Sequence, residues 1–133
     1  MIRMQMLPSS MVYSPTMKHI IKALILTLIL LAGSAVADTQ QEIDHLLDFV
    51  AKTNCQYDRN GTVHSGLDAR DHINMKYEHY RKKVKTAEDF IKYSATKSMM
   101  SGKKYKIRCP GAEAVNASDW LLEELHRYRK ASG

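Results

Sequence analysis

The sequence lacks an apolar run long enough to cross a bilayer. Its main apolar stretch, residues 23–31, is far shorter than the roughly 20 apolar residues that a membrane-spanning helix needs. Lys22 precedes this stretch, and small residues follow it up to Ala37. A basic region, an apolar run and an Ala-x-Ala ending are typical of a secretory signal peptide. We therefore expect export and cleavage after Ala37, with retention as an uncleaved anchor as the alternative.

The same segment decides how much of the chain folds. We expect residues 1–37 to be an N-terminal extension with a cleaved signal peptide, and residues 38–133 to form a single small domain. Met17 begins a complete signal peptide by itself. This leaves open whether residues 1–16 are translated.

The chain has only two cysteines, Cys55 and Cys109. In an oxidising compartment, two cysteines in a small domain most simply form one disulfide bond. The bond would stabilise the domain by roughly 4 kcal/mol according to the chain-entropy model. Two separate buried thiols are the alternative.

The chain also has little excess charge outside the signal segment. Its net charge of +6 falls to about +3 once Arg3, Lys18 and Lys22 are removed. So small an excess does not indicate nucleic acid as a partner. Outside the cytoplasm, the available acidic partners are lipid head groups, envelope polymers and other proteins.

Metal-binding and catalytic motifs are missing as well. The six histidines form neither an H-x-x-x-H nor an H-E-x-x-H motif, and we expect neither a metal ion nor a cofactor. Residues 94–97 have the S-x-x-K spacing of penicillin-binding proteins. However, the partner motifs S-D-N and K-T-G are absent, and the domain is too small for that fold.

Hydrophobic periodicity predicts an α+β domain, with three or four helices packed on a two- or three-stranded antiparallel sheet. Asn60-Gly61 is a strong signal for a hairpin turn, because a type I′ turn requires positive φ at both central positions. The expected helices cover residues 40–53, 66–84 after a Ser65 cap, 87–98 after a Thr86 cap, and a final segment after a Ser118 cap. The expected strands cover residues 55–59, 62–64 and 104–109.

The strand at residues 104–109 alternates strictly between apolar and basic residues. Tyr105 and Ile107 should face the core, on the side of Cys109. Lys104, Lys106 and Arg108 should then form a basic stripe on the outer side. Two explanations of this basic stripe remain open: a contact surface for an anionic envelope component, and protection of an edge strand against pairing.

The order of several short motifs resembles the YfeK-like family of small secreted bacterial proteins, which carries a domain of unknown function. The resemblance implies a periplasmic protein of a Gram-negative bacterium, and brings no known activity, cofactor or partner. It rests on Arg59-Asn60-Gly61, His64, His72-Ile73, Lys76-Tyr77, Thr86-Ala87-Glu88, Phe90-Ile91, Ser98, Ser101-Gly102, Tyr105 and Trp120-Leu121.

The polar members of these motifs are the candidate binding residues. Together they could line one shallow site, or each could cap, turn or pair locally. We expect a non-enzymatic binding or interaction protein of the bacterial envelope, whose partner is an anionic envelope component or another periplasmic protein. The alternative is a small periplasmic hydrolase that uses a polar cluster around His72 and Ser101. The candidates are Arg59, Asn60, His64, His72, Lys76, Ser98, Ser101 and Tyr105.

Overall fold

The structure is a computed structural model that describes residues 38–133, and these residues belong to one compact unit. The expected signal peptide and its cleavage after Ala37 lie outside the described residues. Within residues 38–133, no helix has the length and apolar character that a bilayer crossing demands.

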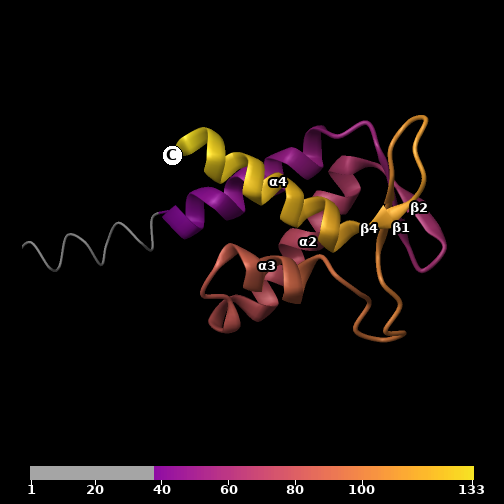
Figure 1. The fold of residues 1–133 in the computed structure, drawn as a ribbon. Helices are drawn as coiled ribbons and strands as arrows, with labels where there is room; N and C mark the ends of the chain where they lie inside the picture. The colour runs from indigo at the N-terminus through magenta and orange to yellow at the C-terminus, as the bar shows by residue number, and fades with distance from the viewer. Residues whose placement is uncertain (1–37) are drawn as a thin grey trace, which may run out of the picture. The chain divides into compact units, whose positions relative to one another are not determined.

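The described residues form an α+β fold, as predicted (Figure 1). A first helix covers residues 38–52. The elements that follow are β1 (Gln56–Arg59), β2 (Thr62–His64), α2 (Gly66–Tyr80), the 3₁₀ helix η2 (Arg81–Lys83), α3 (Ala87–Ser94), β3 (Lys106–Arg108), β4 (Val115–Asn116) and α4 (Ala117–Ser132).

The sheet has four antiparallel strands in the order β2-β1-β3-β4. The β1–β2 hairpin turns at Asn60 and Gly61, whose φ angles of 56° and 84° confirm the predicted turn. The fourth strand, β4, is not among the strands expected from the sequence. It is only two residues long, too short to show an alternating pattern, and it forms by pairing Ile107 with Val115.

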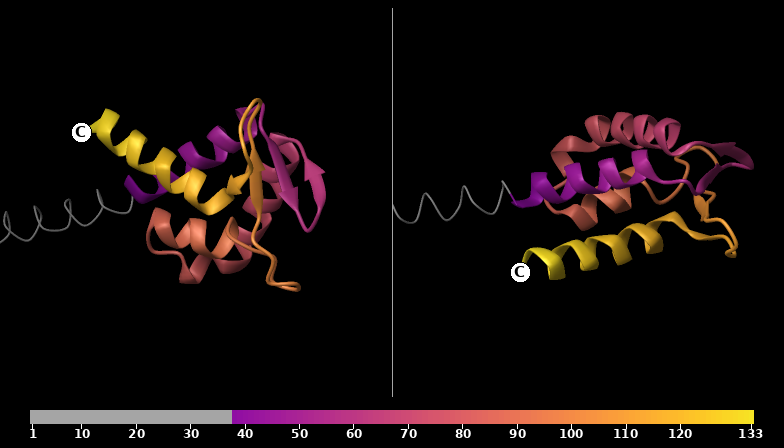
Figure 2. Two further views of the ribbon diagram at one scale, coloured as in Figure 1. Left: turned by 45° about the vertical axis from the view of Figure 1, so that its right-hand side comes forward. Right: turned by 90° about the horizontal axis from the view of Figure 1, so that it is seen from above.

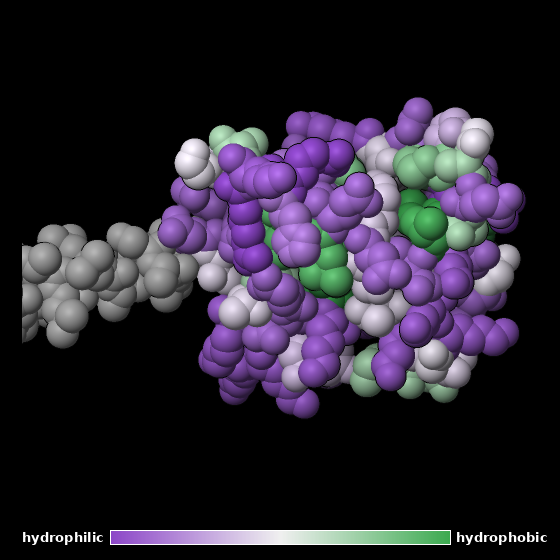
Figure 3. All heavy atoms as spheres, in the orientation of Figure 1, coloured by the Kyte–Doolittle hydropathy of each residue, from purple (hydrophilic) through white to green (hydrophobic). Residues whose placement is uncertain are grey.

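The helices all lie on one side of the sheet, as both views in Figure 2 show. Tyr57 of β1 and Ile107 of β3 are register partners, and both side chains are buried against the helices. Tyr105 is also buried, at 2% exposure, whereas Lys104, Lys106 and Arg108 are exposed. The predicted faces of this segment are therefore confirmed. On the face drawn in Figure 3, apolar surface is confined to small patches among hydrophilic residues.

The helix at residues 38–52 packs against two others. It contacts α4 through a 2.7 Å hydrogen bond between His45 Nε2 and Glu124, and through the rings of Phe49 and Trp120, whose centroids are 4.5 Å apart. It contacts α2 where the Tyr77 hydroxyl donates to Gln40 at 3.3 Å. The first helix is thereby joined to both α4 and α2.

Two of the predicted helix caps, those of Ser65 and Thr86, are present. Ser65 accepts a hydrogen bond from the Asp68 amide, and Thr86 forms a capping box with Asp89. The prediction that Ser118 caps the last helix is wrong. That helix begins at Ala117, directly after β4, and the Ala117 amide donates to the Tyr105 carbonyl at 2.9 Å. The neighbouring strand segment thus supplies an acceptor that the sequence pattern could not indicate.

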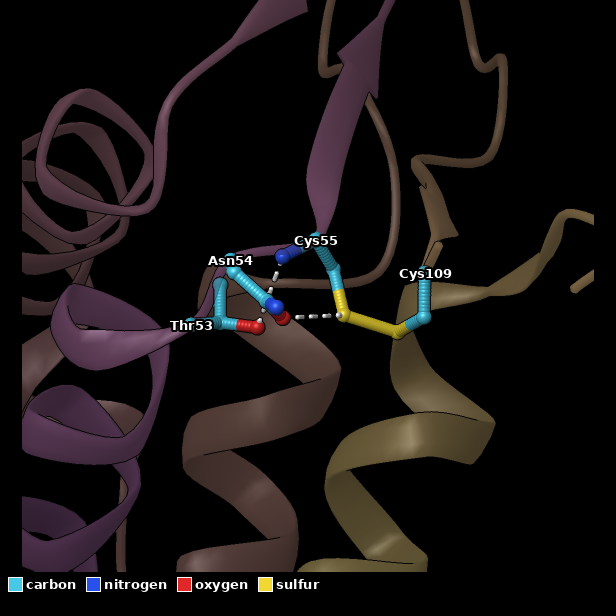
Figure 4. The surroundings of a disulfide bond; sticks show 4 residues. All are labelled: Thr53, Asn54, Cys55 and Cys109. Carbon is cyan, nitrogen blue, oxygen red and sulfur yellow. Dashed lines mark hydrogen bonds between the residues drawn. A yellow bond between two sulfur atoms is a disulfide. The ribbon is translucent and has the colours of Figure 1, made fainter. Parts of the chain in front are cut away.

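The disulfide bond between Cys55 and Cys109 is present, which confirms the predicted pairing (Figure 4). The two cysteines lie one position beyond the Gln56–Arg108 pair on neighbouring strands, and their Cα atoms are 4.1 Å apart. The Cys55 amide also donates to Thr53 Oγ1 at 3.1 Å. The bond therefore fastens the end of the β1–β3 ladder.

The basic stripe of Lys104, Lys106 and Arg108 does not protect a sheet edge. Its central strand, β3, lies between β1 and β4, so the edge-protection explanation is wrong for this strand. The stripe is also less isolated than the sequence suggested, because Lys106 donates to Asn116 Oδ1 at 2.7 Å and has Asp58 as its register partner on β1. Its role as a contact surface for anionic material stays a prediction.

Candidate functional site

A pocket of about 510 Å³ lies between α2, the β1–β2 turn and the segment before β3. Its volume falls within the range of small-molecule sites. Six of the eight candidate binding residues line it; the exceptions are His64 and Ser101. The lining residues are Arg59, Asn60, His72, Met75, Lys76, His79, Tyr80, Ser98, Met99, Met100 and Tyr105.

One wall of the pocket is a stripe along α2. The core-facing positions of this helix are Ala69, Ile73 and Tyr77. The residues of α2 that line the pocket lie on the adjacent face of the helix: His72, Met75, Lys76, His79 and Tyr80, at helical spacing. One helix therefore packs against the core and lines the pocket with adjacent faces.

The hairpin brings a guanidinium to the opposite side. Arg59 follows Tyr57 by two positions on β1, so both side chains leave the sheet on the same face. Tyr57 is buried under the helices, whereas Arg59 lies at the end of the strand and stays partly exposed. His64 pairs with Tyr57 on β2 and acts electrostatically on His72, although it does not line the pocket.

The third wall is a tight turn between α3 and β3. We predicted that the helix would run to a break at Met99, but α3 ends at Ser94, because the backbone that follows pairs with the segment before β3. The Tyr105 amide donates to the Thr96 carbonyl at 3.0 Å, and the Ser98 amide donates to the Lys103 carbonyl at 3.0 Å. This local pairing holds Met99 and the rest of the turn over the pocket.

Side chains within this turn fix its conformation. Ser98 Oγ accepts hydrogen bonds from the amides of Met100 and Ser101, both at 3.3 Å. The Ser101 hydroxyl donates to Asn60 Oδ1 at 2.7 Å, which joins this turn to the turn of the hairpin. For these three candidates (Asn60, Ser98 and Ser101), the structure therefore shows the local turn-forming roles that were the alternative to ligand contact.

The polar centre of the pocket is the Tyr105 hydroxyl. Lys76 Nζ donates to it at 3.4 Å, and His72 Nε2 lies 3.3 Å from it. Lys76 Nζ also donates to the Lys97 carbonyl at 2.8 Å and lies 5.0 Å from the centre of the Tyr105 ring. Tyr57 supports this ring from the core at a centroid distance of 5.7 Å.

Burial and nearby cations set the protonation states of this centre. Burial, together with the charges of Arg59, Lys76 and His64, lowers the pKa of His72 to about 4. Burial, and then the Arg59 guanidinium, also lowers the pKa of Lys76. Burial raises the pKa of Tyr105. At neutral pH the imidazole is therefore uncharged, and its Nε2 can accept a hydrogen bond from the Tyr105 hydroxyl.

The pocket contains two cationic side chains and no carboxylate. Among the residues that line it, Arg59 and Lys76 carry the charge, and none is Asp or Glu. An ammonium group has three N–H donors. Within the described part of the chain, Lys76 Nζ has two acceptors, the Lys97 carbonyl and the Tyr105 hydroxyl. One N–H donor thus remains for a ligand.

The arrangement does not form a nucleophile and base from His72 and Ser101. The Ser101 hydroxyl donates to Asn60 and accepts from the Lys103 amide, whereas His72 is bonded to Tyr105. A serine nucleophile requires a base within hydrogen-bond reach. Across residues 38–133, no group of three or more His, Cys, Asp or Glu side chains is placed to hold a metal ion.

Sequence reasoning missed the other residues that line the pocket. Met75 and His79 share the helix face of His72 and Lys76, and this spacing could have identified them. Met99 and Met100 directly follow the helix expected at residues 87–98 and are not among the candidate residues. Their position beside α2 depends on the backbone pairing of residues far from α2 in the sequence, so no local signal indicates it.

Comparison with known proteins gives a family without a known activity. The model of a protein family described as a family of unknown function (DUF5329) matches residues 37–129. The chain is also similar to the uncharacterized protein YfeK of Salmonella typhimurium (strain LT2). The two are 33% identical over 92 residues, which cover 67% of this chain and 77% of that protein. No solved structure matches.

Proposed function

This chain belongs to the family of unknown function DUF5329. We propose that it acts in the periplasm as a non-enzymatic protein that binds a small anionic molecule. The binding site is the pocket between α2, the hairpin turn and the turn before β3. The candidate residues that contact the anion are Arg59 and Lys76.

The observation that carries this proposal is the pair of cations without a carboxylate. Lys76 is half-buried, and burial lowers its pKa. A cation that is partly removed from water and lacks an opposite charge is unfavourable. A bound anion would offset this cost and would accept the remaining N–H of Lys76. The Arg59 guanidinium could bind the same anion through two parallel hydrogen bonds.

The local geometry favours binding over catalysis. Tyr105 has a raised pKa and His72 is uncharged at neutral pH, so the centre offers hydrogen bonds rather than an activated nucleophile. Export is supported by the pattern that ends at Ala37 and by the Cys55–Cys109 bond, because disulfide bonds persist in oxidising compartments.

The test compares the affinity of the protein for anions with its affinity for neutral molecules of similar shape. Hexanoate, benzoate and glycerol phosphate are titrated into the exported protein by calorimetry, alongside their neutral counterparts hexanol, benzyl alcohol and glycerol. We expect at least one anion to bind more tightly than its neutral counterpart. Replacing Lys76 with Met should weaken that binding about 10- to 100-fold, as the loss of a charge-assisted hydrogen bond implies.

A matched control removes the same charge outside the pocket. Lys85 is exposed and does not line the pocket, so Lys85→Met should bind the anion as the wild type does. Equal weakening in both variants would attribute the effect to net charge. If no anion bound better than its neutral counterpart, the proposal would be wrong.

A further inference from the structure

Three of the residues that line the pocket are exposed methionines. Met75, Met99 and Met100, which we call the methionine rim, are 63%, 65% and 99% exposed. The described residues include six exposed large apolar side chains, and half of them belong to this rim. Single exposed apolar residues need no explanation, but their concentration at one cavity indicates a binding surface.

Packing of the fold does not account for the methionine rim. Met75 lies on a face of α2 next to the buried face, and is not one of the core positions Ala69, Ile73 and Tyr77. Met99 and Met100 occupy the tip of the turn, whose conformation is set by backbone pairing and by Ser98 rather than by apolar contacts. A methionine side chain is flexible and polarisable, so it adapts to apolar ligands of varied shape.

We propose that the ligand of this pocket is a single-chain anionic amphiphile, whose head group contacts Lys76 and Arg59 and whose alkyl chain lies on the methionine rim. This inference rests on the function proposed above. It adds the chemical class of the ligand, because the cations by themselves would also suit a small inorganic anion. The free N–H of Lys76 sets where the head group binds, and the rim sets where the chain leaves the pocket.

The rim does not suit a metal ion equally well. Thioethers and imidazoles together bind soft metal ions, and His72 and His79 also line the pocket. However, the charges of Arg59 and Lys76 repel any metal cation at the same site. An amphiphile with a negative head satisfies both the cations and the apolar rim.

The length of the ligand's alkyl chain is the variable that tests whether the ligand is an amphiphile. Complete burial of a methylene group is equivalent to about fourfold in affinity, and an open rim should give about twofold per methylene. Titration calorimetry is run with carboxylates from butyrate to decanoate, each below the concentration at which it forms micelles, and with the alcohols of matching length. We expect affinity for the carboxylates to rise steadily with chain length.

Protein variants separate the contribution of the ligand's head group to affinity from that of its alkyl chain. The double variant M99Q/M100Q should lose most of the dependence on chain length and keep the affinity for butyrate. K76M should instead lose most of the preference for carboxylates over alcohols, with Arg59 left as the cation that contacts the head group, and should keep the dependence on the length of the alkyl chain. Leu67→Gln is the matched control, because Leu67 is 57% exposed on α2 and does not line the pocket. It should behave as the wild type.

The outcomes distinguish this inference from the proposed function. If butyrate and decanoate bound equally and both bound better than their alcohols, the amphiphile would be ruled out and the anion site would stand. If alcohols bound as tightly as carboxylates, the anion site itself would be wrong. Binding to phosphatidylglycerol vesicles without any binding of monomeric decanoate would also overturn the inference, because the protein would then recognise a lipid surface.

Discussion

The Lys76 ammonium donates a hydrogen bond to the Tyr105 hydroxyl at 3.4 Å, and this contact joins α2 to the segment that precedes β3. His72, one helical turn earlier on α2, lies 3.3 Å from the same hydroxyl. One phenol oxygen therefore organises the polar centre of the pocket, while its ring packs into the core beside Tyr57.

Replacing Tyr105 with Phe should separate these two roles. The ring stays in the core and the hydroxyl is lost, so we expect the free energy of unfolding to fall by only about 0.5–1.5 kcal/mol. Tyr105→Ala also removes the buried ring and should cost about 3–5 kcal/mol. Urea unfolding of the three proteins measures both. Equal losses in the two variants would show that the hydroxyl, not the ring, provides the stability.

Stability should decrease with falling pH because of His72. Its pKa is about 4 in the folded protein and near 6.5 in the unfolded chain. Between these values the unfolded chain binds a proton that the folded protein does not, so stability is lost as the pH falls from 6.5 to 4. The imidazole is only partly buried, so we expect a loss of no more than about 1–2 kcal/mol.

Comparison with His72→Gln isolates this contribution, because the other groups titrate in both proteins. The difference in unfolding free energy between wild type and variant should change across that pH range and be constant above it. A constant difference from pH 4 to pH 7 would mean that His72 has an ordinary pKa in the folded protein.

The disulfide bond should be a large contributor to stability. It joins residues 54 apart in the sequence, and the chain-entropy model gives roughly 4 kcal/mol for a loop of that length. We expect C55A/C109A to unfold at a much lower urea concentration than the wild type. Thiol labelling of the native, unreduced protein should find no free cysteine, and two labelled thiols per chain would contradict the bond.

Reversal of the basic stripe should leave the fold intact. Lys104 and Arg108 are exposed, and such surface changes usually alter stability by less than about 0.5 kcal/mol each. Reversal of Lys106 also removes its hydrogen bond to Asn116 and puts a like charge opposite Asp58, so we expect it to cost about 1 kcal/mol more. Ile107→Ala, on the buried face of the same strand, should cost about 2–5 kcal/mol.

If the basic stripe binds anionic envelope material, the charge-reversed protein should lose salt-sensitive retention on anionic vesicles. Equal, salt-insensitive retention of both proteins would remove that role.

Export should yield a chain that begins at Asp38. The prediction rests on Ala35-Val36-Ala37 after the apolar run. Mass spectrometry of the protein from the periplasmic fraction determines its first residue. An intact N-terminus in the membrane fraction would instead indicate an uncleaved anchor.

Several parts of this protein were determined by the sequence alone, because their causes are local. Asn60-Gly61 adopts positive φ with little strain, and this places the hairpin turn. Alternation fixes Tyr105 and Ile107 on one face and the lysines on the other, since successive side chains of a strand point to opposite sides. The Ser65 and Thr86 caps likewise depend on residues only three positions away.

Only the tertiary structure decided the rest, because it depends on contacts between distant segments. The strand β4 exists through its pairing with β3, and this pairing also moves the start of the last helix from the position that Ser118 suggested. Lys76 meets Tyr105 across 29 residues of sequence, and the rim forms because the turn of Met99 is folded back beside α2. The polar candidates could be identified from their motifs, but periodicity reports only which face a side chain occupies. The residue across from that face is set by how the helices and the sheet pack together.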